Sequence, residues 1–188
     1  MAAIAATLVA SESIGWGGST AWLSPSMLFG LVIPLALGAL LTDRAHLLGL
    51  GLGAARRGSL VLALGIPATL GAMVVLVQGS QVEAFYRGHG GAPFELALGY
   101  LPAILQVEVC FRGVLLFGLL PRLGIPLAIS VSVLPYGLIH LDKPIEEALG
   151  SILVGIALSA ASVWCRSIWY GLVLHLIGAV TLTLLARG

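Results

Sequence analysis

A glutamate and an arginine stand four residues apart inside a long apolar stretch, QVEVCFRGVLLFGL. This spacing places Glu108 and Arg112 on one face of a helix, within reach of an ion pair. A charged side chain at the centre of a membrane costs about 2.5–3.5 kcal/mol on insertion, so an ionisable residue there predicts a functional site. A buried salt bridge that serves only the fold is the alternative interpretation.

Two histidines lie in other apolar stretches. His140 ends the run PYGLIH, and His175 stands near the middle of the last stretch, in WYGLVLHLIG. An imidazole can accept or donate a proton near neutral pH. A single histidine in an apolar segment usually belongs to the core, but two histidines and a carboxylate on three segments indicate a shared polar site.

One carboxylate and two imidazoles form a set that can activate water for hydrolysis. The carboxylate removes a proton from the water, while an imidazole orients the water or stabilises the developing oxyanion. Two histidines and one carboxylate also match the ligand set of zinc hydrolases, although the sequence contains no HExxH motif. We therefore favour metal-free chemistry with no cofactor, and keep zinc as the alternative.

The apolar stretches that carry these residues are long enough to cross a membrane as helices. A span needs about 20 apolar residues. Apolar runs bounded by charge, glycine and proline predict about six spans, at 22–42, 58–78, 96–120, 123–141, 146–164 and 167–186. Because the runs do not alternate with period two, a membrane β-barrel is disfavoured. The predicted fold is an all-α, polytopic transmembrane helix bundle, with residues 1–188 in a single domain and a Gly-rich loop at 79–94.

The composition agrees with a membrane protein. Hydrophobic residues make up 59% of the 188 residues and charged residues 9%, against about 25% charged in soluble domains. The expected partner is the lipid bilayer, and the scattered basic residues argue against nucleic-acid binding. Cys110 and Cys165 lack CxxC spacing, so we expect two small buried apolar side chains.

The basic residues divide unequally between the two predicted sides of the membrane. Five fall on one side and three on the other: Arg44, Arg56, Arg57, Arg122 and Arg166 against Arg87, Lys143 and Arg187. Because cytoplasmic loops carry the excess of lysine and arginine, the first side is predicted to be cytoplasmic and the polar site to open outward.

Three motifs resemble those of a known family. Its Glu-Glu-x-x-x-Arg motif resembles the run from Val107 to Arg112, its Phe-x-x-x-His motif resembles Tyr136 to His140, and its His-x-x-x-Asn/Asp motif resembles His175 to Ala179. Over about residues 100–180 the chain thus resembles the CPBP family of intramembrane proteases, which groups CAAX endopeptidases with bacteriocin-processing proteins. Lys143, Pro144 and Glu147 resemble the Lys-Pro-x-x-Glu pattern of a single-glutamate bacterial branch.

The resemblance implies an intramembrane glutamic endopeptidase, a multi-pass protein of the bacterial inner membrane. It implies substrates that are membrane proteins or lipid-anchored peptides, including the C-terminal tails of exported proteins. It also implies roles for seven residues: Glu108, His140 and His175 are catalytic, Arg112 and Tyr136 support the site, and Lys143 and Glu147 line the cavity mouth or bind substrate.

The chain departs from the family pattern at two positions. Val107 stands where the family usually has its first glutamate, and Ala179 replaces the polar residue that helps to bind the oxyanion. Either Glu108 acts as the base, or the protein is a non-catalytic member with an immunity or partner-binding role. A small transporter or proton relay would use the same buried polar residues.

Overall fold

The computed structural model describes residues 27–36 and 48–187, and every regular element in these ranges is helical. Six α-helices and two π-helical segments (η) follow one another in these ranges. Their bounds are η2 (Leu28–Val32), α4 (Ala55–Leu76), α5 (Ser80–Tyr86), α6 (Pro93–Val107), η4 (Glu108–Phe117), α7 (Gly118–Leu138), α8 (Ile145–Cys165) and α9 (Trp169–Leu185). The prediction of an all-helical membrane bundle is confirmed.

Three helical segments are long and apolar enough to cross a membrane. They are Ala55–Leu76, Pro93–Leu138 and Ile145–Cys165, and the apolar helix α9 adds 17 residues. The predicted spans 58–78, 146–164 and 167–186 therefore match α4, α8 and α9. The predicted span 22–42 is described only over residues 27–36, and Arg44 lies outside the described residues.

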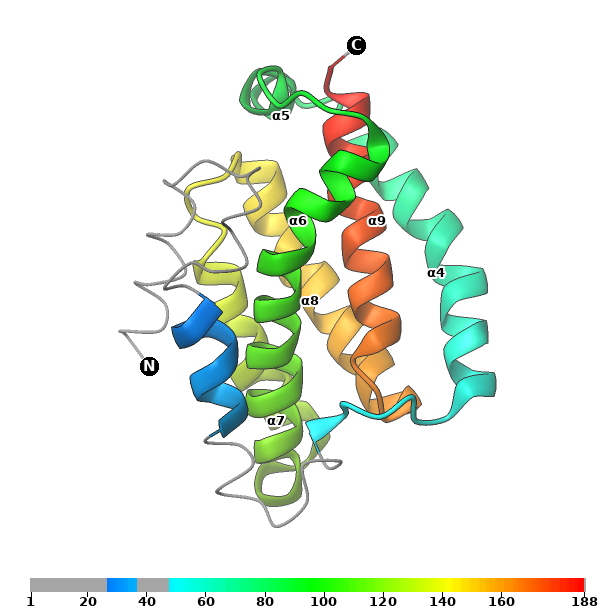
Figure 1. The fold of residues 1–188 in the computed structure, drawn as a ribbon, viewed down its shortest axis with the longest axis vertical. Helices are drawn as coiled ribbons and strands as arrows, with labels where there is room; N and C mark the ends of the chain where they lie inside the picture. The colour runs from blue at the N-terminus through cyan, green and yellow to red at the C-terminus, as the bar shows by residue number, and fades with distance from the viewer. Residues whose placement is uncertain (1–26, 37–47, 188) are drawn as a thin grey trace.

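The predicted spans 96–120 and 123–141 belong to one bent unit, formed by α6, η4 and α7. The bend lies at Gly124, whose φ of 71° is a left-handed conformation that glycine adopts without steric cost. Figure 1 shows α6 running down one side of the molecule and α7 returning upward behind it. The last helix of this unit ends at Leu138, so His140 lies in the following turn rather than inside a span.

The predicted loop 79–94 contains a short helix, α5, so the loop prediction is wrong for residues 80–86. Val82 and Tyr86 lie one turn apart in α5, and both are buried against Leu182 and Ala186 near the end of α9. Only two buried positions mark a helix of seven residues, so its sequence lacks a clear helical period.

Helix α9 lies at the centre of the bundle and contacts α4, α6 and α8 (Figure 1). Small residues let α4 approach it closely. A Cβ atom at Gly58 of α4 would lie 2.0 Å from the ring of Tyr170, a distance that side chains do not tolerate. Through these contacts α9 is fixed in the bundle, and His175 is fixed with it.

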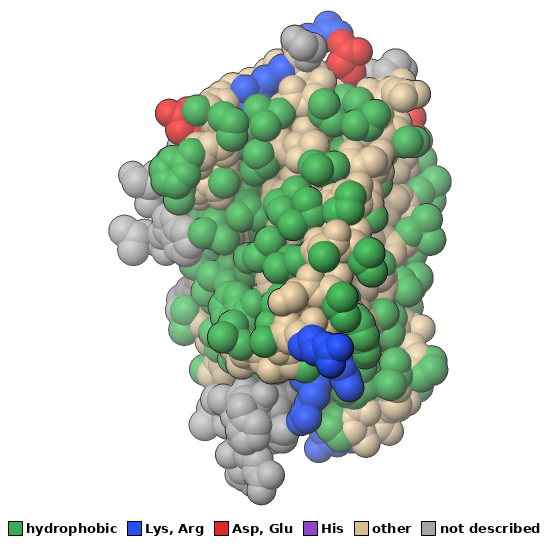
Figure 2. Space-filling model, turned by 90° about the vertical axis from the view of Figure 1, so that its right-hand side faces the viewer, with side chains coloured by type: hydrophobic (Ala, Val, Ile, Leu, Met, Phe, Trp, Pro, Cys, Tyr) green, Lys and Arg blue, Asp and Glu red, His purple; other side chains and the backbone are tan. Residues whose placement is uncertain are grey.

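The basic residues gather at the two ends of the bundle. The start of α4 with Arg56 and Arg57, the turn after Arg122 and the end of α8 before Arg166 lie together at the lower end of Figure 1. The chain segments of Arg87, Lys143 and Arg187 lie at the upper end. Figure 2 shows an apolar flank between a basic lower end and an upper end of mixed charge. The described basic residues are thus divided as the sequence predicted.

Candidate active site

The π-helical segment η4 carries the buried ion pair. Glu108 and Arg112 are 0% and 1% exposed, and Nη1 of Arg112 lies 3.2 Å from Oε1 of Glu108. Wide helical turns of this kind are rare and are often found at functional sites. The pair lies between neighbouring helices, since η4 contacts α6, α7 and α8. The predicted contact between the two side chains is therefore present in the fold.

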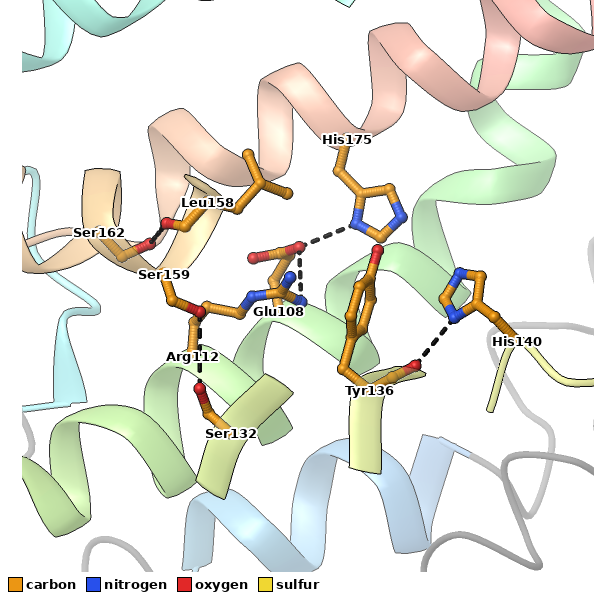
Figure 3. A network of polar contacts seen from close by, with 9 residues as sticks. All are labelled: Glu108, Arg112, Ser132, Tyr136, His140, Leu158, Ser159, Ser162 and His175. Atoms are coloured by element: carbon orange, nitrogen blue, oxygen red, sulfur yellow. Dashed lines mark hydrogen bonds and ion pairs between the residues drawn. The ribbon is translucent and has the colours of Figure 1, made fainter. Parts of the chain in front are cut away.

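The imidazole of His175 reaches the same carboxylate from α9. Its Nδ1 atom lies 2.8 Å from Oε1 of Glu108 (Figure 3). The two residues are 67 positions apart in the chain. Oxygen Oε1 thus holds both the imidazole and the guanidinium. The other oxygen, Oε2, is buried and accepts no hydrogen bond from any described residue.

The ring of Tyr136, from α7, lies beside both histidines (Figure 3). Its centroid is 4.7 Å from that of His140 and 6.0 Å from that of His175. The guanidinium carbon of Arg112 lies over the ring at 4.1 Å, a cation–π distance. Tyr136 is buried, so its ring helps to fix the position of Arg112.

His140 lies in the turn after α7, and its Nδ1 atom is 2.9 Å from the carbonyl oxygen of Tyr136. Burial lowers the pKa of this imidazole to about 4, so the ring is neutral at pH 7. Because a carbonyl oxygen can only accept, Nδ1 carries the proton of the neutral ring and donates it. The second nitrogen, Nε2, therefore keeps its lone pair and can accept a proton.

Only some of the polar residues predicted from three segments contact one another directly. Glu108, Arg112 and His175 contact one another, and Tyr136 contacts Arg112 through its ring face. His140 contacts the ring of Tyr136, which also contacts His175 (Figure 3). The catalytic roles of Glu108, His140 and His175 stay predictions.

Glu147 and Lys143 lie toward the upper end of the bundle, near α5. The hydroxyl of Tyr86 donates to the carboxylate of Glu147, at 2.8 Å from Oε1 and 2.9 Å from Oε2. The ammonium of Lys143 lies 5.0 Å from the ring centroid of Phe85 and 5.7 Å from that of Tyr86. Glu147 thus ties α8 to α5, while its proposed contact with substrate stays a prediction.

Tyr86 is the residue at this end that the sequence analysis missed. Its signal is weak, because Tyr86 lies in a short helix inside a stretch interpreted as a loop. The spacing of four residues between Val82 and Tyr86 is the only sequence feature that marks a buried face there. The partner, Glu147, is 61 positions away, which no local pattern indicates.

The structure also bears on the predictions for metals and cysteines. Within residues 27–36 and 48–187, no group of three or more His, Cys, Asp and Glu side chains is arranged to hold a metal ion. Cys110 and Cys165 are free and buried, as expected of small apolar side chains. Cys110 belongs to an apolar cluster with Phe111 and Tyr136.

Comparison with known proteins gives a family match. Residues 90–181 match the family described as type II CAAX prenyl endopeptidase Rce1-like. No curated protein and no solved structure gives a significant match. The matched range contains Glu108, Arg112, His140 and His175. The match supports the CPBP family assignment and, at the level of the family, a CAAX-type intramembrane protease and thus a hydrolase.

Proposed function

We propose that this protein is an intramembrane glutamic-type endopeptidase in which Glu108 activates water. The observation that carries the proposal is the asymmetry of the Glu108 carboxylate. Oε1 contacts His175 and Arg112, whereas Oε2 is buried and accepts no hydrogen bond from any described residue. A buried carboxylate oxygen without a donor is costly, so Oε2 is suited to accept a hydrogen bond from a water.

The charged partners of Glu108 make this chemistry possible in a membrane. Arg112 offsets the cost of burying the carboxylate and holds Oε1 in place. His175 contacts the same oxygen and can pass a proton onward. Since Val107 replaces the first glutamate of the family motif, the mechanism uses one carboxylate.

The proposed peptide hydrolysis uses Glu108 and His140 in the positions described above. Glu108 takes one proton of the water on Oε2, and the water oxygen bonds to the scissile carbonyl carbon. The carbonyl π electrons move to oxygen, which becomes an oxyanion. When this intermediate collapses, the carbon–oxygen double bond re-forms and the carbon–nitrogen bond breaks. The leaving nitrogen takes the proton from Glu108, and His140 Nε2 orients the water.

The position of the site supports the substrate class that we propose. His140 and Glu147 lie toward the upper end of the bundle, which carries fewer basic residues. If that end faces outward, the site suits membrane-bound polypeptides such as exported proteins with a C-terminal membrane tail. We place the enzyme in a bacterial inner membrane, with Lys143 and Glu147 near the point of substrate entry.

A matched pair of glutamate variants tests the proposal. The protein is co-expressed with tail-bearing membrane proteins encoded nearby, and cleavage is followed as a shift in substrate size. Glu108→Gln should abolish cleavage, because an amide cannot take the proton. The control, Glu83→Gln, alters an exposed glutamate of α5 and should leave cleavage unchanged. Full cleavage by Glu108→Gln would show that another group activates the water.

The same assay separates other functions. Loss of cleavage on adding a chelator would favour zinc chemistry. If the wild-type protein cleaves none of these substrates, while a biological effect survives Glu108→Gln, the protein is a non-catalytic binding factor.

A further inference from the structure

The proposed hydrolysis needs a hydrogen-bond donor for the oxyanion. Removing one such donor from an enzyme typically lowers the rate by about 10²–10³-fold. Ala179, one turn after His175, has no polar side chain that serves here. The donor must therefore come from another element of the site.

The Nδ1 atom of each histidine already has an acceptor. Nδ1 of His175 contacts Glu108, and Nδ1 of His140 contacts the carbonyl oxygen of Tyr136. Nη1 of Arg112 is paired with Glu108. In neutral His140 the second nitrogen carries no proton, so it accepts rather than donates. Nε and Nη2 of Arg112 are buried and have no acceptor among the described residues, and the phenol of Tyr136 is an uncharged donor beside this guanidinium.

The position of the Tyr136 hydroxyl suits this role. The ring extends from α7 and contacts both histidines, and Figure 3 shows the hydroxyl directed toward His175. Its ring lies against the guanidinium of Arg112, which pairs with Glu108, so the phenol lies beside the charged groups of the site. A phenol in a low-dielectric environment, with a guanidinium over its ring at 4.1 Å, is a strong hydrogen-bond donor.

We infer that Tyr136 is a catalytic residue, whose hydroxyl donates a hydrogen bond to the oxyanion formed during peptide hydrolysis. This inference rests on the proposed endopeptidase function. As the water oxygen bonds to the carbonyl carbon and its proton passes to Oε2 of Glu108, negative charge develops on the carbonyl oxygen. The phenol hydrogen bonds to that oxygen and stays on Tyr136. The bond is released when the carbon–nitrogen bond breaks and the nitrogen takes the proton from Glu108.

Tyr136→Phe tests the inference, because it removes the hydroxyl and keeps the ring over Arg112. The measurement is single-turnover cleavage by protein that elutes as one monodisperse peak in detergent. Cleavage should slow by about 10²–10³-fold with KM little changed, since the bond forms only in the transition state. The matched control is Tyr170→Phe, which removes a hydroxyl that donates to Leu52 at the other end of the bundle and should leave the rate unchanged.

A second variant separates a lost donor from altered packing. Replacing Tyr136 with 4-aminophenylalanine keeps an N–H donor at the same place on the ring and should retain most of the rate. Equal slowing by this variant and Tyr136→Phe would overturn the donor role, as would full activity of Tyr136→Phe. If Glu108→Gln abolishes cleavage while Tyr136→Phe does not, only the role of Tyr136 fails. If the wild-type protein cleaves nothing, the proposed function itself fails.

Discussion

Two glutamate–arginine pairs with the same spacing occur in this chain, and their surroundings differ. Glu83 and Arg87 lie on α5, 2.7 Å apart, with side chains that are 51% and 69% exposed. Glu108 and Arg112 lie on η4, 3.2 Å apart, and both are buried. The exposed pair has the shorter contact, yet water screens it. The spacing of four residues allows each ion pair to form, whereas exposure or burial determines what the pair contributes to stability.

The energetic difference follows from solvation. An exposed pair at this spacing contributes about 0.3–0.5 kcal/mol, because both ions keep most of their hydration. A buried pair has lost its hydration, so each ion depends on the other. Glu108 also holds His175, whereas the Glu83 carboxylate faces solvent. Because the second pair is buried, losing either ion should destabilise the protein, and Glu108 is also placed to contact His175.

The largest effect should come from removing one arginine of each pair. Arg112→Met leaves the Glu108 carboxylate buried without its cation, so the free energy of unfolding should fall by about 3–5 kcal/mol. Arg87→Met removes only a screened contact and should cost about 1 kcal/mol or less. Thermal and denaturant unfolding in detergent would measure both values. Similar losses of stability in the two variants would contradict the expected difference between the buried and the exposed pair.

A double variant serves as the control for charge. Glu108→Gln combined with Arg112→Met removes both ions, so no unpaired charge stays buried. Most of the stability lost in Arg112→Met should return, while cleavage stays absent. A double variant as unstable as Arg112→Met would mean that packing, rather than charge, sets the cost.

A smaller effect is expected on the inner face of α5. Tyr86→Phe removes the hydroxyl that donates to Glu147, a bond between α5 and α8. A hydrogen bond to a charged group contributes about 1.5–3 kcal/mol, and partial exposure places this one at the lower end. Amide hydrogen exchange in α5 should become faster, while Glu83→Gln on the outer face leaves it unchanged. Equal exchange in the two variants would contradict this difference between the faces.

The fold was predictable to the extent that apolar length determines it. Long apolar runs predict the helices at 55–76, 145–165 and 169–185 because backbone groups in lipid must bond within their own segment. The break predicted between the spans 96–120 and 123–141 lies within a few residues of the bend at Gly124. The helix α5 was missed, because it becomes visible only through its contacts with α9.

The candidate site was predictable in its composition and less so in its geometry. Buried ionisable residues stand out in an apolar sequence, which identified Glu108, Arg112, His140 and His175. The contact between Glu108 and His175 depends on how α9 packs in the bundle. The contacts of the Tyr136 ring with both histidines depend on where α7 ends. Contacts of this kind join distant segments, and no local pattern specifies them.

The smallest expected effect tests whether Oε2 of Glu108 must be accessible. A Cβ atom at Gly171 would lie 3.6 Å from Oε2, an ordinary contact distance, so Gly171→Ala should fold. Its methyl group would cover the oxygen that is proposed to accept the proton, and cleavage should slow about tenfold, or 1.4 kcal/mol in the barrier. Gly71→Ala on α4 adds the same methyl group with no atom within 4 Å, and should leave cleavage unchanged. Equal rates in the two variants would mean that water reaches Glu108 from another side.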